Sequence, residues 1–554
     1  MTATINRRRF LGGAVAGVAV LGVSRVPAAA TTPARRLPDP GSVSETDPAL
    51  MSATSAAALL QAGHLHPREL LDACITRSRA FDGEIGAWIR MYPEIAYAAA
   101  DAAAERLGRA RRDGVPESPL CGVPIALKDI FAVAGLPLTA SSRVLEGNVA
   151  AGDSGVWRRL RDAGAVLLGH VHTDEFAIGV ATSQVGNPWN TDFSPGGSSG
   201  GSAAALAARF VPLSVGSDTG GSVRLPASAC GVSSVKPSFG RVSVAGMIPL
   251  TPTRDHVGVL GRSVGDAVLL LDALVGEDPS DPATLLGPPL GGEGFASAAR
   301  GGAAPLGGSR LGVPDAAVAK LPAPLRSLFD GLLDAARALG AEIVPVVAPA
   351  EPASLATGDM AEMGTYHRQF SDRVHLYRPE RLPALASAAA GLALPAAEYF
   401  GLERDRLRFQ YDYNRMFVDN DLDAVVYPGT FVDGARRNEF LEYTVSAGVQ
   451  GDVRWANYAG APVVSIPVGR SSATGIPFGV QIGGRAWQDR EVVAVALELQ
   501  EALPVWRDVP PIAPAPRAIP EVPLAAAGPG PDPTNTLDAR ATILPAITTA
   551  TGPG

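Results

Sequence analysis

Two glycine- and serine-rich clusters, joined by an alanine-rich run, constrain this chain more than any other feature. The stretch runs from residue 194 to 222 as S-P-G-G-S-S-G-G-S-A-A-A-L-A-A-R-F-V-P-L-S-V-G-S-D-T-G-G-S, with Ser198 and Ser222 lying 24 residues apart. Glycines beside a serine leave backbone N–H groups open around the hydroxyl and permit positive φ angles. Converging donors of this kind suit a site that stabilises a developing oxyanion. The alanine run predicts one helix between the clusters, which a flexible linker would not need.

Apolar spacing along the rest of the chain predicts alternating helices and strands. Spacings of three and four, and short apolar runs, predict helices over residues 54–62, 67–80, 94–112, 154–163, 223–230, 264–275, 325–339 and 489–502 and strands over 122–129, 165–169, 311–314, 342–347, 422–427, 462–467 and 478–482. Residues 350–420 are predicted to be helical and rich in aromatics. This alternation predicts an α/β sheet with helices on both faces.

The two ends of the chain do not share this pattern. Three arginines at 7–9, a mild apolar run over 12–23 and small residues at 28–30 predict a Tat-type signal peptide over residues 1–30. Residues 31–48 form a Pro-rich linker and 506–554 a Pro/Ala-rich tail predicted to be poorly ordered, which leaves 49–505 as the folded domain. We therefore expect export by the Tat machinery to the periplasm or cell envelope, or secretion.

Composition excludes some classes of protein. A net charge of −8 without a basic segment argues against a nucleic-acid partner. Three cysteines cannot form a disulfide framework and are interpreted as core residues: Cys74, Cys121 and Cys230. Only three of the 47 basic residues are lysines: Lys128, Lys236 and Lys320. Arginine keeps its proton in a protein, whereas a buried lysine can lose it, so each lysine is a candidate for a neutral amine.

Two catalytic interpretations follow known serine motifs. The pattern G-x-S-x-G fits around Ser198 and again around Ser199, with three histidines downstream: His256, His367 and His375. This hydrolase elbow gives no reason for the second cluster. The pattern S-x-x-K occurs at 233–236, but its companion elements S-D-N and K-T-G are missing. Lys236 precedes Pro237 and is expected to be structural or at the surface.

Two further interpretations use other chemistry. His170 and His172 with Asp174 and Glu175 resemble a metal site, but no third ligand has a useful spacing, and a packed or solvent-facing pair is favoured. The last interpretation uses Lys128, Ser198 and Ser222. A lysine acts as a base when burial lowers its pKa from ~10.4 toward neutrality. A serine hydroxyl both donates and accepts, so Ser198 can relay a proton from Ser222.

At this point the sequence resembles the amidase signature family, which includes fatty acid amide hydrolase, bacterial peptide amidase and the glutaminase subunit of tRNA-dependent amidotransferases. The matching segments are G-V-P-I-A-L-K-D (122–129), G-N-P-W-N (186–190), P-G-G-S-S-G-G-S (195–202), G-S-D-T-G-G-S-V-R-L-P-A (216–227), G-V-S-S-V-K-P-S-F-G (231–240) and D-H-V-G (255–258). They extend over roughly residues 49–503. The resemblance implies a single large α/β/α sandwich with a mixed central sheet, and no cofactor or metal.

Position by position, the resemblance implies a Ser-Ser-Lys triad: Lys128 as the base, Ser198 as the bridging serine and Ser222 as the nucleophile. It also implies a cis peptide bond between Gly197 and Ser198. The implied oxyanion donors are backbone N–H groups of Thr219, Gly220, Gly221 and Ser222. The implied supporting residues are Ser199 beside Lys128, and Asp218 paired with Arg224. The chain has His170 and His172 where many relatives carry Lys and Asn, which argues against close kinship with the tRNA-dependent enzymes.

The predicted activity is serine-dependent hydrolysis of a carboxylic amide to an acid and an amine or ammonia, through an acyl-enzyme. The alternatives are a glutaminase-type subunit of an amidotransferase, and a non-catalytic envelope-binding protein on the same scaffold. The expected partner is a small-molecule amide, and a homodimer is a family-level expectation. The aromatics of 350–420 suggest an acyl pocket, although such residues more often belong to a core. Aryl, fatty, peptide C-terminal and oligomeric amides all stay open as substrates.

Overall fold

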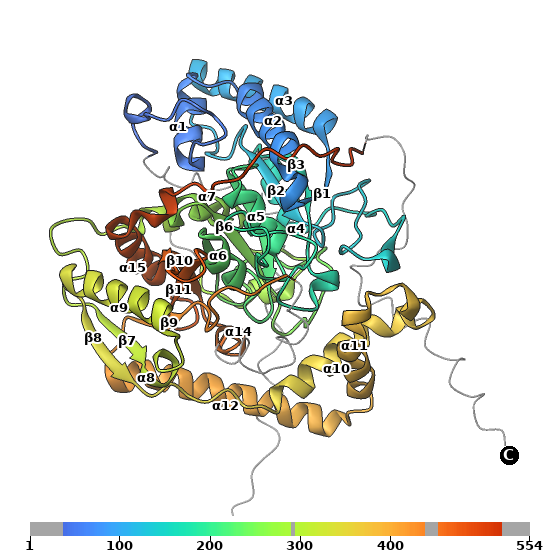
Figure 1. Ribbon diagram of the computed structural model, residues 1–554, viewed down its shortest axis with the longest axis vertical. Coiled ribbons are helices and arrows are strands. Elements are labelled where there is room, and N and C mark those ends of the chain that lie inside the picture. The colour runs from blue at the N-terminus through green and yellow to red at the C-terminus, as the bar shows by residue number, and fades with distance from the viewer. Residues whose placement is uncertain (1–36, 290–293, 438–452, 523–554) are drawn as a thin grey trace, which may run out of the picture.

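An eleven-stranded mixed sheet runs through the part of the chain described by the computed structural model, residues 37–289, 294–437 and 453–522 (Figure 1). The strand order across the sheet is β1-β3-β2-β4-β6-β5-β10-β11-β9-β7-β8. The strands are β1 (Trp88–Met91), β2 (Pro124–Lys128), β3 (Val166–Val171), β4 (Leu213–Asp218), β5 (Ser233–Lys236), β6 (His256–Gly261), β7 (Arg310–Pro314), β8 (Glu342–Val346), β9 (Ala424–Pro428), β10 (Val463–Arg470) and β11 (Pro477–Gly483).

Parallel pairing brings the two Gly-Ser clusters to the end of β2. Strands β3, β2 and β4 pair in parallel, as do β9, β7 and β8, whereas the strands between β4 and β9 pair antiparallel. Because β2 and β4 run the same way, their carboxyl ends lie at the same edge of the sheet. Lys128 ends β2 and Asp218 ends β4, so the second cluster begins beside the lysine.

Helices cover both faces of this sheet, which confirms the predicted α/β/α sandwich with a mixed central sheet (Figure 1). Helices α5 and α6 pack on one another and on the central strands, while α7, α9 and α15 form a second packed group. The helices of the described residues are α1 (Ala53–Ala62), α2 (Pro67–Ile85), α3 (Pro93–Asp113), α4 (Gly155–Asp162), α5 (Gly200–Ala207), α6 (Arg224–Cys230), α7 (Val264–Leu274), α8 (Asp315–Val318), α9 (Ala323–Ala338), α10 (Leu355–His367), α11 (Leu382–Gly391), α12 (Ala396–Asn420), α14 (Trp455–Tyr458) and α15 (Asp489–Ala502).

The alanine-rich run between the clusters forms α5, a helix buried along its whole length, as predicted. The sequence prediction lacks four of the eleven strands: β1, β4, β5 and β6. Of these, β4 follows α5 and leads into the second cluster. Every residue of β4 is buried, so its sequence L-S-V-G-S-D lacks the apolar alternation of a half-exposed strand. Of the two alternatives for Lys236, structural or at the surface, the structure supports the first, because it ends β5 with no exposed surface.

The C-terminal segment continues past the predicted domain end at residue 505. Residues 510–522 run along α2 and β1, shown in dark red in Figure 1. The Ala515 N–H donates to the Ala80 carbonyl at 2.9 Å, and the Met91 N–H donates to the Pro520 carbonyl at 2.8 Å. A Cβ at Gly83 would lie 2.4 Å from the Ala515 oxygen, so a glycine is required there. The expectation of poor order is therefore wrong for residues 510–522, and residues 523–554 lie outside the described chain.

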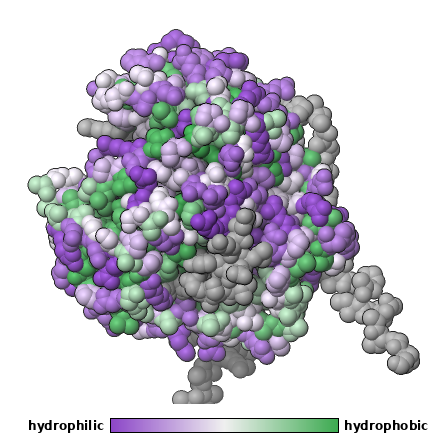
Figure 2. All heavy atoms as spheres, in the orientation of Figure 1, coloured by the Kyte–Doolittle hydropathy of each residue, from purple (hydrophilic) through white to green (hydrophobic). Residues whose placement is uncertain are grey.

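Helices α10 and α11 pack on one another at the bottom of Figure 1, and α12 packs on α10 and also on the β8 edge of the sheet. Most of the aromatics in this unit are buried in the core: Tyr366, Phe370, Tyr377, Phe409 and Tyr413. Phe400 and Tyr411 are exposed, and on the face shown in Figure 2 hydrophobic and hydrophilic residues are intermixed.

Within the described residues no single helix has the length and apolar character to cross a membrane. One bent pair of helices, Pro379–Gly391 with Ala396–Asn420, has them by length and composition only.

Candidate active site

Lys128 lies at the centre of a group of serine hydroxyls with no exposed surface. Its Nζ lies 2.7 Å from Ser198 Oγ, 3.0 Å from Ser199 Oγ and 2.9 Å from Ser217 Oγ. Burial lowers the pKa of this amine from 10.5 to about 7, although the nearby carboxylates of Asp174, Asp218 and Asp255 raise it in part. A substantial fraction of Lys128 is therefore a neutral amine near neutral pH, as the sequence predicted for a base.

The proton of the Ser199 hydroxyl is already used in another hydrogen bond, and this determines which serine the lone pair of Lys128 can accept from. Ser199 Oγ donates to the Ser217 carbonyl at 3.1 Å, so it can only accept a hydrogen bond from Lys128. A neutral amine has two N–H donors and one lone pair. The lone pair is thus left for the hydroxyl of Ser198 or Ser217, and Ser198 is the nearer of the two.

Backbone contacts join the two Gly-Ser clusters. The peptide bond between Gly197 and Ser198 is cis, as predicted. The Ser199 N–H donates to the Ser222 carbonyl at 3.1 Å, which places the backbone of the second cluster against the first. The Ser198 carbonyl accepts from the Asp174 N–H at 2.9 Å, so the chain after β3 holds the cis turn from the other side. Ser222 is 6% exposed.

Ser217 is the contact of Lys128 that the sequence reading missed. It lies on β4, directly before Asp218, and its hydroxyl completes the set of three around the amine. The sequence offered one indication of this role, because Ser217 directly precedes Asp218, which was itself predicted to belong to the site. Without the strand assignment for β4, however, nothing indicated that the Ser217 side chain points toward β2.

The Asp218 carboxylate organises the loop that carries Ser222. Its two oxygens accept from the N–H groups of Gly221 and Val223 at 2.9 and 3.1 Å. Both oxygens also accept from the Arg224 guanidinium at 3.0 Å, so the predicted pair forms, fully buried. Arg224 holds the pKa of Asp218 well below its ordinary value, against the opposing effect of burial. Because the Gly221 N–H is already bonded to Asp218, three of the four predicted oxyanion donors remain: Thr219, Gly220 and Ser222.

Comparisons with known proteins identify the family to which the chain belongs. The family model described as Amidase matches residues 69–493, more than half of the chain. The chain belongs to the amidase family.

Several relatives of this amidase carry names that describe amide chemistry. The A subunit of the glutamyl-tRNA(Gln) amidotransferase of Anaeromyxobacter sp. (strain K) is 35% identical over 474 residues, which cover 78% of this chain and 92% of that protein. The corresponding protein of Salinispora arenicola (strain CNS-205) is 34% identical over 501 residues, covering 83% and 98%. The expectation that His170 and His172 argue against close kinship with the tRNA-dependent enzymes is therefore not supported by the overall identity to these proteins.

Solved structures of amide-cleaving enzymes share the fold of this amidase. The native peptide amidase from Stenotrophomonas maltophilia aligns with a TM-score of 0.70 at 28% identity, covering 85% of this chain and 98% of that one. The 6-aminohexanoate cyclic dimer hydrolase aligns with a TM-score of 0.72 at 25% identity, covering 84% and 99%. Cleavage of carbon–nitrogen bonds is the chemistry that these matches support.

The buried arginine of the loop also ties the amidase site to distant segments. Arg224 donates to the Val453 carbonyl at 2.7 Å, to Gln481 Oε1 at 2.5 Å and to Asn457 Oδ1 at 2.7 Å. Asn457 Nδ2 in turn donates to the carbonyl of Asp218 at 2.8 Å and to its carboxylate at 3.0 Å. Sequence reasoning missed Asn457 and Gln481, because no local pattern links them to residues more than 200 positions earlier.

Three of the five histidines considered for the other interpretations make contacts outside the two Gly-Ser clusters: His170, His256 and His367. Tyr92 OH and the Phe131 carbonyl lie 2.6 and 3.1 Å from the two ring nitrogens of His170, and burial lowers its pKa to about 4. His367 Nδ1 contacts Tyr377 OH at 2.8 Å inside an aromatic cluster. His256 Nδ1 contacts the Arg254 carbonyl at 2.6 Å. In the described chain no ring of these three bonds to a serine of the two clusters. All three cysteines are buried and free, as interpreted from the sequence.

Proposed function

We propose that this amidase hydrolyses carboxylic amides with Ser222 as nucleophile, Ser198 as proton relay and Lys128 as base. One observation carries the proposal: a buried amine with a pKa of about 7 lies 2.7 Å from the Ser198 hydroxyl. An ordinary lysine, charged at neutral pH, has no lone pair to offer. The Ser199–Ser222 backbone contact supports Ser222 as the next member of the relay.

In the proposed reaction, Ser222 Oγ forms a bond to the amide carbon while its proton passes to Ser198. The proton of Ser198 passes to Lys128, and the carbonyl electrons move to the oxygen. The backbone N–H groups of Thr219, Gly220 and Ser222 stabilise this oxyanion, and the loss of one such donor typically slows a reaction by about 10²–10³-fold. Reversal of the relay delivers the proton to the nitrogen, the C–N bond breaks and a neutral amine leaves. Water then takes the place of the amine and releases the acid by the same relay.

The substrate class and location are part of the proposal. We favour a small carboxylic amide, because the aligned peptide amidase and cyclic dimer hydrolase are named for hydrolysis of amides. The predicted Tat-type signal, residues 1–30, lies outside the described residues, and we propose export on the sequence pattern alone. Fractionation of cells that express the full chain, compared with an Arg7/Arg8→Lys variant, checks this: equal cytoplasmic retention of both would refute export.

A second candidate is amide transfer, which the names of the amidotransferase relatives favour. The purified protein alone distinguishes the two functions. Hydrolysis of amides other than glutamine, without a partner protein or tRNA, supports the first function. Ammonia release from glutamine that appears only with partner proteins supports the second.

The decisive experiment compares Lys128→Ala and Ser222→Ala with the parent on a panel of aryl, fatty and peptide C-terminal amides. Both variants should lose at least about 10³-fold in kcat. Residues of one proton relay act as a unit, so removal of any one of them disables the whole relay. A fluorophosphonate should label the parent but not the Ser222 variant. Normal turnover by Ser222→Ala would refute the assignment, and labelling without turnover of any amide would refute the substrate class.

A further inference from the structure

The side chain of Thr219, one of the proposed oxyanion donors, is hydrogen-bonded to a buried carboxylate. Its hydroxyl donates to Asp255 Oδ1 at 2.5 Å. The second oxygen, Asp255 Oδ2, accepts from the N–H groups of Leu250 and Thr251 at 2.9 and 3.2 Å. Asp255 is 2% exposed. The position of Thr219, and with it the direction of its backbone N–H, therefore depends on the turn formed by residues 250–255.

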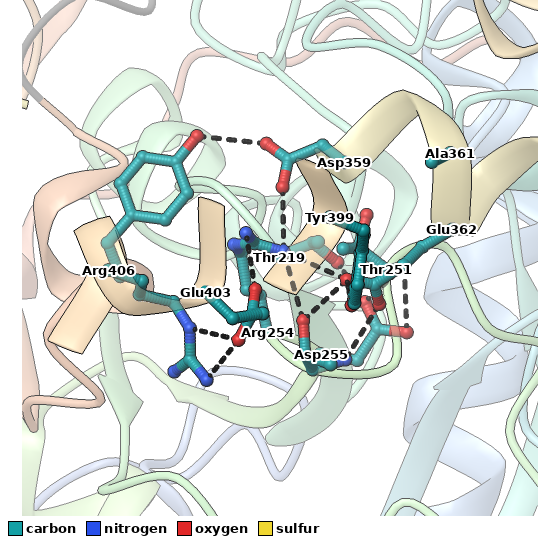
Figure 3. A network of polar contacts seen from close by, with 12 residues as sticks. Thr219, Thr251, Arg254, Asp255, Asp359, Ala361, Glu362, Tyr399, Glu403 and Arg406 are labelled. Atoms are coloured by element: carbon teal, nitrogen blue, oxygen red, sulfur yellow. Dashed lines mark hydrogen bonds and ion pairs between the residues drawn. The ribbon is translucent and has the colours of Figure 1, made fainter. Parts of the chain in front are cut away.

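Helix α10 holds that turn through Glu362 (Figure 3). Glu362 Oε2 accepts from the Thr253 N–H at 3.0 Å. Its other oxygen accepts from Thr253 Oγ1 at 2.7 Å, Arg254 Nη1 at 3.1 Å and Tyr399 OH at 2.9 Å. All four donors converge on one side chain that is 10% exposed. Through Tyr399, α12 supports the same carboxylate.

Arg254 strengthens the connection between the turn and the helical unit. Its guanidinium is 1% exposed and lies 2.8 Å from Asp359 Oδ1 on α10 and 3.4 Å from Glu403 Oε1 on α12, in addition to Glu362. In Figure 3 these carboxylates surround Arg254, while the neighbouring Asp255 points toward Thr219. Adjacent residues of the turn thus bond to the helical unit on one side and to the nucleophile loop on the other.

Packing alone does not fix the turn on the helical side. Pro252, Glu362 and Tyr399 line a cavity of about 480 Å³ between α10, α11 and α12. Side chains around an open space make fewer contacts than those in a filled core. The hydrogen bonds to Glu362 therefore act together with the ion pairs of Arg254 in restraining the turn beside this cavity.

We propose that Glu362 is a positioning residue for amide hydrolysis, acting through Thr253, Asp255 and Thr219 on the oxyanion donor. The proposal rests on the proposed function, since it assigns Thr219 to the oxyanion site of that reaction. An oxyanion donor contributes to the transition state and little to substrate binding. Release of the turn should consequently lower kcat and leave KM nearly unchanged.

The test begins with Glu362→Gln. A glutamine keeps one acceptor oxygen and places an NH₂ group where the second oxygen was. It must therefore give up either the Thr253 N–H or the three donors on Oε1. We expect kcat to fall by about 10-fold, less than for outright loss of a donor, with KM within about twofold. The control is Glu398→Gln, an exposed glutamate one residue before Tyr399, which should stay within about twofold of the parent in both constants.

Two further measurements keep the proposal testable if Glu362→Gln does not fold. Thr253→Val removes the hydroxyl that donates to Glu362, whereas Thr253→Ser keeps it at a partly exposed position. The valine variant should lose kcat and the serine variant should retain it. In a Thr219→Val background, Glu362→Gln should have little additional effect, because the route through the Thr219 hydroxyl is already cut.

Two results would overturn the proposal: a kcat for Glu362→Gln equal to that of the control, or the same loss with and without the Thr219 hydroxyl. A drop in thermal midpoint with unchanged kcat would assign Glu362 to stability alone and would also overturn it. These outcomes are separate from failure of the proposed function, which is diagnosed by turnover in Ser222→Ala.

Discussion

Replacement of Lys128 by methionine should abolish activity. It should also make the protein more stable than the parent at pH 7 and less stable than the parent at pH 9. The ordinary pKa of a lysine is 10.5, and burial lowers that of Lys128 to about 7. Between these values the unfolded chain binds a proton that the folded chain does not. Stability therefore rises with pH in this window, by about 1.4 kcal/mol per pH unit for this group.

The magnitude follows from the same two pKa values. Well below pH 7 the fold carries the full cost of the buried ammonium, about 5 kcal/mol on this basis. At pH 7, where the folded lysine is half protonated, the cost is about 4 kcal/mol. Methionine removes that cost but also the three contacts with Ser198, Ser199 and Ser217, each worth about 1 kcal/mol. The variant should be more stable than the parent by about 1 kcal/mol at pH 7. At pH 9 the parent has gained about 2 kcal/mol, so the variant becomes the less stable protein by about 1 kcal/mol.

Denaturant unfolding of both proteins at pH 7, 8 and 9 measures this difference directly. Lys236 is equally buried, with a pKa also lowered to about 7, but both proteins contain it and its contribution cancels. The parent's kcat/KM should fall about 10-fold per pH unit below pH 7, because only the neutral amine accepts a proton. A stability difference that does not change with pH would refute the neutral lysine and the mechanism built on it.

Two other predictions test the surroundings of the site. Arg224→Leu leaves the Asp218 carboxylate buried without its charge partner and should destabilise the protein by about 3–5 kcal/mol. The control is Arg415→Leu, which removes an exposed ion pair and should cost less than about 1 kcal/mol. Similar unfolding midpoints for the two variants would contradict this prediction. Gly216→Ala places a Cβ 2.7 Å from Ser199 Oγ, so it displaces a side chain that contacts Lys128 and should lower kcat by at least about 10-fold. The control is Gly331→Ala, whose added Cβ has no atom within 4 Å. Equal kcat values for the two variants would show that the site tolerates the displacement.

The resemblance to the amidase signature family implied those parts of the site that the matching motifs contain. The cis bond, Ser199 and the Asp218–Arg224 pair lie within these motifs, and so does Lys128, 70 residues before Ser198. These relations were carried over from the family motifs position by position. The neutral Lys128 was predicted from the residues themselves, because burial at the end of an apolar strand lowers the pKa of an amine.

The remainder of the site depends on contacts between distant segments. Asn457 reaches Asp218 across 239 residues, and Glu362 reaches Thr253 across 109. Nothing in the sequence around Asn457 or Glu362 distinguishes them from other polar residues on helices. Strand β4 was missed for a different reason, because its serines and glycine occupy a sheet position buried on both faces. There the need for space beside Lys128, and not apolar alternation, determines the residue types.

The segment that follows α15 has a consequence for the order of folding. Glu521 forms an ion pair with Arg79 across 442 residues, and Arg517 does so with Asp82 across 435. During synthesis the first helices leave the ribosome long before the segment that covers them has been translated. Their contacts with residues 510–522 consequently cannot form until that segment has emerged, and they close a loop of more than 400 residues.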